Sequence, residues 1–291
     1  MLPKKEWMIM GKGYFVKWLR GVLALCLIVM ALAPLRGEAH TLWINLSEHH
    51  PQDGSTNACF GWGHRYPLDE FLAPEMLTSF ELVHPDGERK TLTPGNGGYL
   101  AGKIDLPEPG NYVVAATLKP MFYTMYREDG EIHHKAGPKT GVSGTILLSA
   151  LAHEYAKALV TVGAPKWEPD KLVVGHKLEI VPLEDPRKLA VGDVVKVRVL
   201  FDGEPMPGAE VSGVYLGAAS DLENPLWTKV AGEEGIAKVC VQHATVGAAL
   251  GAIKRPAVWM LRAIVTRPAP AELKDKCNEL WFVATLTMQI G

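Results

Sequence analysis

The residue best placed to do chemistry is His40, one of ten histidines in the chain. The first 39 residues have the pattern of an export signal, so we expect His40 to become the first residue of the mature protein. A first-residue histidine carries a free α-amine beside its imidazole, and both nitrogens can bind one Cu²⁺ or Ni²⁺ ion. Because the amine has a reference pKa of about 8, losing its proton to a metal at neutral pH costs little. The alternative interpretation is that His40 is a polar residue at a processed terminus with no metal-binding role.

His64 is the best second ligand for such a site. It ends a predicted strand over residues 58–64, in which alternate residues, including Trp62, share its face. We expect this strand to lie beside the first strand of the mature chain, as in a hairpin, with Gly63 keeping the backbone uncrowded. The two histidines would then form a compact nitrogen-donor site. The alternative is a histidine that forms a hydrogen bond at the rim of a sheet.

A third ligand would come from His133 or His134, which follow a predicted turn at residues 128–130. The alternative for this pair is a solvated loop. His49 and His50, just before a proline, carry the same ambiguity. Four further histidines are interpreted as structural or surface residues: His84, His153, His176 and His243.

Catalytic motifs are largely absent. His153-Glu154 begins like the H-E-x-x-H zinc helix, but Lys157 stands where the second histidine is needed. The glycine-rich residues 95–98 lack the Gly-Lys-Ser/Thr ending of a phosphate loop, and there is no Gly-x-Ser-x-Gly motif. The sequence favours a binding protein over an enzyme and leaves the enzyme class open.

Residues 1–39 predict a cleaved signal peptide and therefore a periplasmic protein. They combine a basic opening, an apolar core over residues 21–35 and a small residue, Ala39, before the expected cut. The core is shorter than the roughly 20 residues that a spanning helix needs. The whole chain has 30 Lys and Arg against 32 Asp and Glu. Removal of a basic signal makes the mature chain more acidic, which argues against nucleic acid as a partner.

Three cysteines remain after the predicted cut: Cys59, Cys240 and Cys277. An oxidising compartment permits a disulfide. Cys240 with Cys277 is the preferred pair, because both fall in the second predicted module, although the sequence does not fix the pairing.

Short runs with period-two alternation, separated by Gly, Pro and Asp turns, recur from Thr41 to the end of the chain. This pattern predicts an all-β fold of sandwich type. Residues 149–160, rich in Ala and Leu, are the one predicted helix.

A polar, proline-containing connection at residues 182–191 predicts a domain boundary. The expected organisation is a signal peptide (1–39), an N-terminal β-rich domain with the metal site (40–182) and a C-terminal Greek-key β-sandwich (183–291). The number of short strands in the last segment suits an immunoglobulin-like or transthyretin-like module.

Five segments together resemble the DUF4198 family: AHTLW (39–43), GHRY (63–66), LEIVPL (178–183), LFDGEPMPGA (200–209) and ATLT (284–287). That family is similar to the periplasmic domain of nickel-transport M components. The resemblance implies a periplasmic β-rich protein linked to nickel or cobalt uptake, with a second half like a carboxypeptidase-regulatory module. In such components the metal-binding histidine is second in the mature chain, whereas here His40 is first.

Three functions follow from these features. The leading one is a periplasmic metal-binding protein that delivers nickel or cobalt to a membrane uptake transporter as a separate soluble component. The second is a histidine-brace copper oxidoreductase, which would use the same two histidines. The third is a metal-free adhesive or scaffold sandwich protein, which rests on the fold alone.

Overall fold

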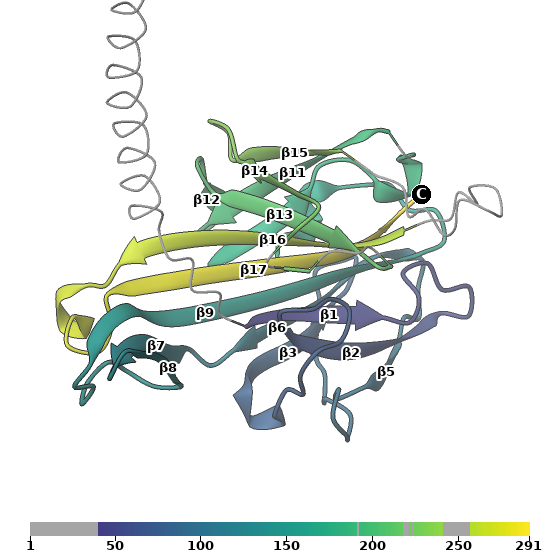
Figure 1. Cartoon of the computed structure of the whole chain (residues 1–291). Helices are drawn as coiled ribbons and strands as arrows, with labels where there is room; N and C mark the ends of the chain where they lie inside the picture. Colours follow the sequence, from purple (N-terminus) through teal and green to yellow (C-terminus); the bar gives the residue numbers. More distant parts are fainter. Residues whose placement is uncertain (1–39, 191, 218–220, 223, 241–256) are drawn as a thin grey trace, which may run out of the picture. The chain divides into compact units, whose positions relative to one another are not determined.

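The computed structural model of the protein describes residues 40–190, 192–217, 221–222, 224–240 and 257–291. The predicted signal peptide and His243 lie outside the described residues. Strands in three sheets dominate, with four short 3₁₀ helices in the described part of the chain (Figure 1). The helices are η1 (Pro74–Met76), η2 (Pro169–Leu172), η3 (Pro186–Lys188) and η4 (Ala271–Leu273). The predicted all-β sandwich fold is confirmed. Within the described ranges, the helices lack the length and apolar character that a membrane crossing requires.

Sheet A carries both leading ligand candidates. Its strand order is β1-β2-β5, and both pairs are antiparallel. The strands are β1 (Thr41–Leu46), β2 (Ser55–Gly63) and β5 (Gly102–Asp105). His40 stands immediately before β1 and His64 immediately after β2.

Sheet B is the ten-stranded centre of the molecule. Its main path is β14-β13-β16-β17-β9-β6-β3-β4, and the hairpin β7–β8 pairs with the remaining length of β9. Its strands are β3 (Leu77–Val83), β4 (Arg89–Thr91), β6 (Gly110–Leu118), β7 (Met121–Glu128), β8 (Glu131–Lys135), β9 (Thr145–Val162), β13 (Glu210–Tyr215), β14 (Trp227–Val230), β16 (Ala257–Pro268) and β17 (Glu279–Ile290). β9 and β17 pair in parallel.

Sheet C is built around β11, which pairs with β10, β12 and β15. The strands are β10 (Leu178–Pro182), β11 (Val194–Phe201), β12 (Glu204–Pro205) and β15 (Ile236–Cys240). In Figure 1, β11 and β15 lie on one side of β9 and β17, and β1 and β2 lie on the other.

Two apolar cores form on opposite faces of sheet B. Because successive side chains of a strand point to opposite faces, Val114 and Ala116 of β6 pack into the core shared with sheet A. Their neighbours Val113 and Ala115 pack into the core shared with sheet C. The central strands are therefore buried on both faces.

The predicted helix over residues 149–160 is wrong, because these residues lie within β9. β9 pairs with β6 and β7 along one edge and with β17 along the other, and most of its residues are buried. A strand covered on both faces carries a nearly continuous apolar run, which periodicity alone does not separate from a buried helix.

The predicted boundary at residue 182 falls between β10 and β11, which pair with each other in sheet C. Sheet B likewise contains strands from before and from after that boundary. The division into two separate modules stays a prediction.

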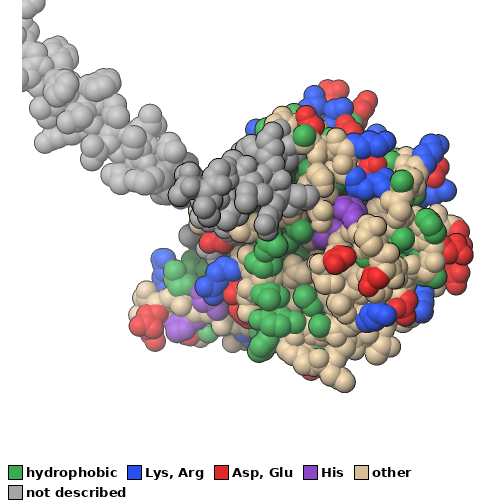
Figure 2. Space-filling model, turned by 90° about the vertical axis from the view of Figure 1, so that its right-hand side faces the viewer, with side chains coloured by type: hydrophobic (Ala, Val, Ile, Leu, Met, Phe, Trp, Pro, Cys, Tyr) green, Lys and Arg blue, Asp and Glu red, His purple; other side chains and the backbone are tan. Residues whose placement is uncertain are grey.

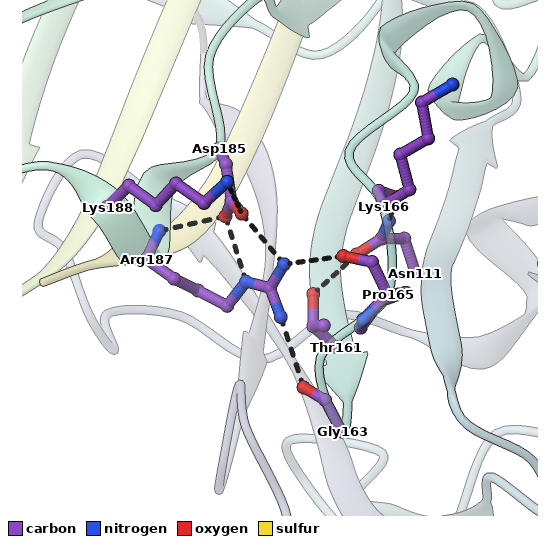
Figure 3. Close-up of polar contacts among 8 residues, drawn as sticks. All are labelled: Asn111, Thr161, Gly163, Pro165, Lys166, Asp185, Arg187 and Lys188. Atoms are coloured by element: carbon purple, nitrogen blue, oxygen red, sulfur yellow. Dashed lines mark hydrogen bonds and ion pairs between the residues drawn. The ribbon is translucent and has the colours of Figure 1, made fainter.

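Arg187 ties the predicted linker to the loop after β9 (Figure 3). Its guanidinium donates to both carboxylate oxygens of Asp185, at 2.9 and 2.8 Å, and to the carbonyls of Gly163 and Pro165, both at 3.1 Å. Burial alone would raise the pKa of Asp185, but its hydrogen bonds with Arg187 outweigh burial and lower the pKa. The connection is therefore fixed by charge-assisted hydrogen bonds.

The preferred disulfide is also wrong, because Cys59, Cys240 and Cys277 are all free. Cys240 is exposed in β15 of sheet C, whereas Cys277 is buried beside Leu151 and Ala269, just before β17 of sheet B. Cys240 therefore lies in sheet C, whereas Cys277 precedes a strand of sheet B, and the shared predicted module does not pair them.

Charged side chains of both signs are interspersed over the face of the molecule in Figure 2. Among the described residues of that face, this mixture differs from the continuous basic surface that nucleic-acid binding favours.

A buried ion pair joins sheet B to sheet C. Lys157 of β9 and Glu179 of β10 are each 1 % exposed, and the Lys157 Nζ lies 2.6 Å from Oε1 of Glu179. Lys157 also donates to the carbonyl of Leu172, and Glu179 accepts from the amide of Val174. Burial alone would raise the pKa of Glu179, but the Lys157 charge and these hydrogen bonds lower it.

Replacement of one partner should therefore destabilise the fold strongly. Lys157→Met leaves a buried carboxylate without its counter-charge, and we expect the free energy of unfolding to fall by about 3–5 kcal/mol in urea denaturation. The control is Lys177→Met, which removes an exposed ion pair with Asp202 and should change it by less than about 1 kcal/mol. Equal losses in the two variants would contradict the assignment.

Candidate metal centre

The hairpin of β1 and β2 brings His40 and His64 side by side. Leu42 pairs with Trp62 and Thr41 with Gly63, and the next pair outward is His40 with His64. Both backbone groups of Leu42 bond to side chains outside the hairpin, so Leu42 and Trp62 form a non-hydrogen-bonded pair. The pair type repeats every two residues, so His40 and His64 form a pair of the same type. Side chains approach each other most closely in such pairs. The two imidazole ring centroids are 4.7 Å apart, with 52° between the ring planes.

Trp62 and Glu70 complete the surroundings of His40. The Trp62 ring contacts the His40 ring, with the centroids 4.2 Å apart and 37° between the ring planes. Glu70 forms a bridge with Trp62 on the other side of β2, and its Oε1 lies 3.0 Å from the His40 Nε2. The two side chains are 36 % and 51 % exposed, so the site is open to solvent.

The turn after β2 fixes the backbone of His64. The Asp69 carboxylate accepts hydrogen bonds from the amides of His64 and Arg65, at 2.8 and 3.1 Å. Burial alone would raise the pKa of Asp69, but these amides and the Arg65 side chain lower it. Gly63 has φ +129°, and a Cβ there would meet the Asp69 Oδ2 at 2.5 Å, so the turn requires glycine.

Glu154 lies beneath the hairpin and is 1 % exposed. Its Oε2 accepts the amide of Leu42 at 2.7 Å, while Thr285 of β17 donates its hydroxyl to the Leu42 carbonyl at 2.8 Å. Burial raises the pKa of Glu154 to about 8, although the Leu42 amide and the Trp62 indole act in the opposite direction. Glu154 is therefore mainly a neutral acid at pH 7.

His133 and His134 do not join the pair. Both lie in β8, where His133 stacks on Tyr126 and His134 Nδ1 lies 2.5 Å from the Tyr123 hydroxyl. Tyr126 pairs with Ile146 of β9, whereas Leu42 reaches Glu154, roughly 25 Å further along the same strand at about 3.3 Å per residue. In the described part of the chain, no three His, Cys, Asp or Glu side chains are grouped so as to hold a metal ion.

Three other histidines have structural contacts. The buried His49 has its Nδ1 2.7 Å from the carbonyl of Leu159, and burial lowers its pKa to about 4. His153 stacks on Phe282, with ring centroids 4.9 Å apart, and His176 contacts Tyr155. These contacts agree with the structural role expected for His153 and His176.

Sequence patterns did not assign Glu70 or Glu154 to the histidine site, and the H-E-x-x-H reading that includes Glu154 failed at Lys157. Glu70 precedes no recognisable motif, and its approach to His40 depends on the turn after β2. Glu154 was placed on an expected helix, where strand alternation does not apply. Once residues 145–162 form a strand, Glu154 faces β1, and its neighbours His153 and Tyr155 face sheet C.

The fold and the site define an all-β sandwich protein with a histidine pair at the start of its first described strand. The chain belongs to the family described as "Domain of unknown function (DUF4198)", whose model matches residues 37–267. No curated protein matches the chain.

Three solved structures are similar over most of the chain, at low TM-scores. A tetra-tandem repeat from the extending region of a large adhesion protein has 8 % identity and a TM-score of 0.21, covering 86 % of this chain and 74 % of its own. The D0-D1 domain of intimin has 14 % identity and a TM-score of 0.22, covering 86 % and 99 %. A DUF3823 family protein from Parabacteroides merdae has 9 % identity and a TM-score of 0.21, covering 87 % and 98 %. Nothing about function follows from scores this low.

The neutral Glu154 predicts a pH dependence of stability. Its pKa is raised from 4.5 to about 8 on folding, so its contribution to stability is complete below pH 4.5. That contribution is lost as the pH rises towards 8, because only the unfolded state ionises. The total loss is about 5 kcal/mol, from about 1.4 kcal/mol per pKa unit.

Glu154→Gln keeps the shape of the neutral acid and cannot ionise. We expect the free energy of unfolding, measured in urea between pH 5 and pH 8, to fall less with pH in this variant than in the wild type. Parallel pH profiles for the two proteins would show that Glu154 ionises equally in the folded and unfolded states.

Proposed function

We propose that this protein is an exported, periplasmic metal-binding protein that holds one divalent transition-metal ion at His40 and His64. The observation that carries the proposal is the pairing of these two imidazoles, 4.7 Å apart, with Glu70 Oε1 3.0 Å from the His40 Nε2. Export and cleavage after Ala39 form part of the proposal, because the third donor is the α-amine that cleavage would create.

Glu70 supports a specific binding mode for His40. Metal-binding histidines commonly donate their second ring N–H to a carboxylate, which fixes the tautomer and the orientation of the ring. With Nε2–H donated to Glu70, the Nδ1 of His40 is the acceptor nitrogen, on the same side of the ring as the backbone. Nδ1 and the α-amine then chelate the ion, and His64 supplies the third nitrogen. A donor set of this kind suits Ni²⁺, Co²⁺ and Cu²⁺.

Nickel or cobalt is the proposed ion, supported by the resemblance to nickel-transport M components alone. On that basis, the protein delivers or buffers the ion for a membrane uptake transporter, as a separate component. Because His40 is first in the proposed mature chain rather than second, the binding mode uses the amine and the ring rather than intervening backbone amides.

The decisive experiment is isothermal titration of the processed protein with Ni²⁺, Co²⁺ and Cu²⁺, after mass spectrometry has confirmed that it begins at His40. We expect one ion per chain. A version that retains residues 36–39 before His40 should bind on the order of a hundredfold more weakly, because its α-amine is then four residues away from the His40 ring and one of three nitrogen donors is lost. His64→Ala should weaken binding similarly.

The matched control is the double variant His133→Ala, His134→Ala. These histidines lie in a different hairpin, so their loss should leave the affinity unchanged. Tight binding of Cu²⁺ with consumption of oxygen or peroxide in the presence of reductant would instead favour the histidine-brace oxidoreductase. If neither the processed nor the extended protein binds any of the three ions, the metal proposal is wrong and the adhesive or scaffold function replaces it.

A further inference from the structure

We propose that Glu154 and Thr285 are positioning residues for the metal site: they replace a neighbouring strand at the free edge of β1 and so hold His40 opposite His64. The effect on metal binding rests on the proposed function, whereas the hold on β1 can be measured in the metal-free protein.

β1 is the edge strand of sheet A, because β2 is its one neighbour there. An edge strand leaves a row of backbone N–H and C=O groups without strand partners. The edge of β1 is not exposed to water, since Leu42 is 1 % exposed and packs into the core between sheets A and B. Its backbone groups therefore need partners inside the protein.

Two side chains from adjacent strands of sheet B provide those partners. Glu154 of β9 accepts the Leu42 amide at 2.7 Å, and Thr285 of β17 donates to the Leu42 carbonyl at 2.8 Å. Both side chains are nearly inaccessible to solvent, at 1 % and 2 % exposure. One residue of β1 is thus held through both of its backbone groups, which fixes the position of β1 along sheet B.

The position of Leu42 determines the position of His40. His40 lies two residues earlier in the chain, and as the first residue of the proposed mature protein it has no preceding segment to anchor it. Chain termini are usually poorly ordered unless they are tied down. The described contacts of the His40 side chain are with Glu70, Trp62 and His64 at the open site. Within the hairpin, Thr41 pairs with Gly63, and the buried contacts of Leu42 attach this end of β1 to sheet B.

Thr285→Val removes one hydroxyl at constant shape and leaves the Leu42 carbonyl buried without its donor. In the metal-free mature protein, we expect the amides of Thr41, Leu42 and Trp43 to exchange with solvent faster by roughly tenfold, the effect of about 1.4 kcal/mol. The amide of Val114, in the same core, should be unchanged if the effect is confined to β1. In the metal titration, affinity should fall by at least about tenfold, as for other residues that orient metal ligands.

Thr287→Val is the matched control. Thr287 lies in the same strand as Thr285 and is also buried, but its hydroxyl has no hydrogen-bond partner among the described residues. This variant should match the wild type in both measurements. Glu154→Leu should behave like Thr285→Val, and Glu154→Gln should restore binding, because its amide oxygen can still accept the Leu42 amide.

The outcomes separate this inference from the proposed function. If the wild type binds metal and Thr285→Val matches it in amide exchange and affinity, Glu154 and Thr285 are not positioning residues, while the metal site stands. If the wild type binds no metal but Thr285→Val speeds exchange at residues 41–43 alone, the hold on β1 stands and the proposed function fails. Equal acceleration at Val114 would indicate general destabilisation and overturn the inference.

Discussion

The structure depends on one constraint: the central strands of sheet B are covered on both faces. β9 and β17 pair in parallel through their buried stretches, with sheet A against one face and sheet C against the other. Every second residue of these strands must therefore suit one core, and the residues between them must suit the other. Parallel strands buried on both sides are consequently rich in apolar residues throughout, as the sequence of β9 is.

Three buried polar residues of β9 and β17 bond to partners in another sheet. On one face, Lys157 reaches Glu179 of sheet C. On the other, Glu154 and Thr285 reach the backbone of Leu42 in sheet A. A buried polar group without a partner costs about 1–3 kcal/mol, so these contacts restrict how the three sheets can stack. The same restriction gives the histidine pair a fixed support at the surface.

Period-two alternation predicted short strands from Thr41 onwards, including the strand before His64, because a strand with one buried face repeats apolar residues at every second position. It failed at β9, where alternation is masked by burial on both faces, and the Ala-rich and Leu-rich run was taken for a helix. The Cys240–Cys277 pair was preferred from their position in one predicted module, whereas Cys240 lies in sheet C and Cys277 lies just before β17 of sheet B. The contacts of Glu70 with His40 and of Glu154 with Leu42 had no sequence signal, since they span 30 and 112 residues of chain.

By itself, the sequence determined that the chain is all-β and that His40 and His64 flank two early strands. Both are local properties, because alternation and turn residues act over a few positions. Tertiary structure alone decided that β1 and β2 pair in the register that brings the two imidazoles within 4.7 Å of each other. It also decided that β8 carries His133 and His134 elsewhere and that the buried Glu154 bonds to β1. These outcomes depend on which faces of distant strands pack together, and packing is set by the whole set of side chains in the two cores rather than by any short segment.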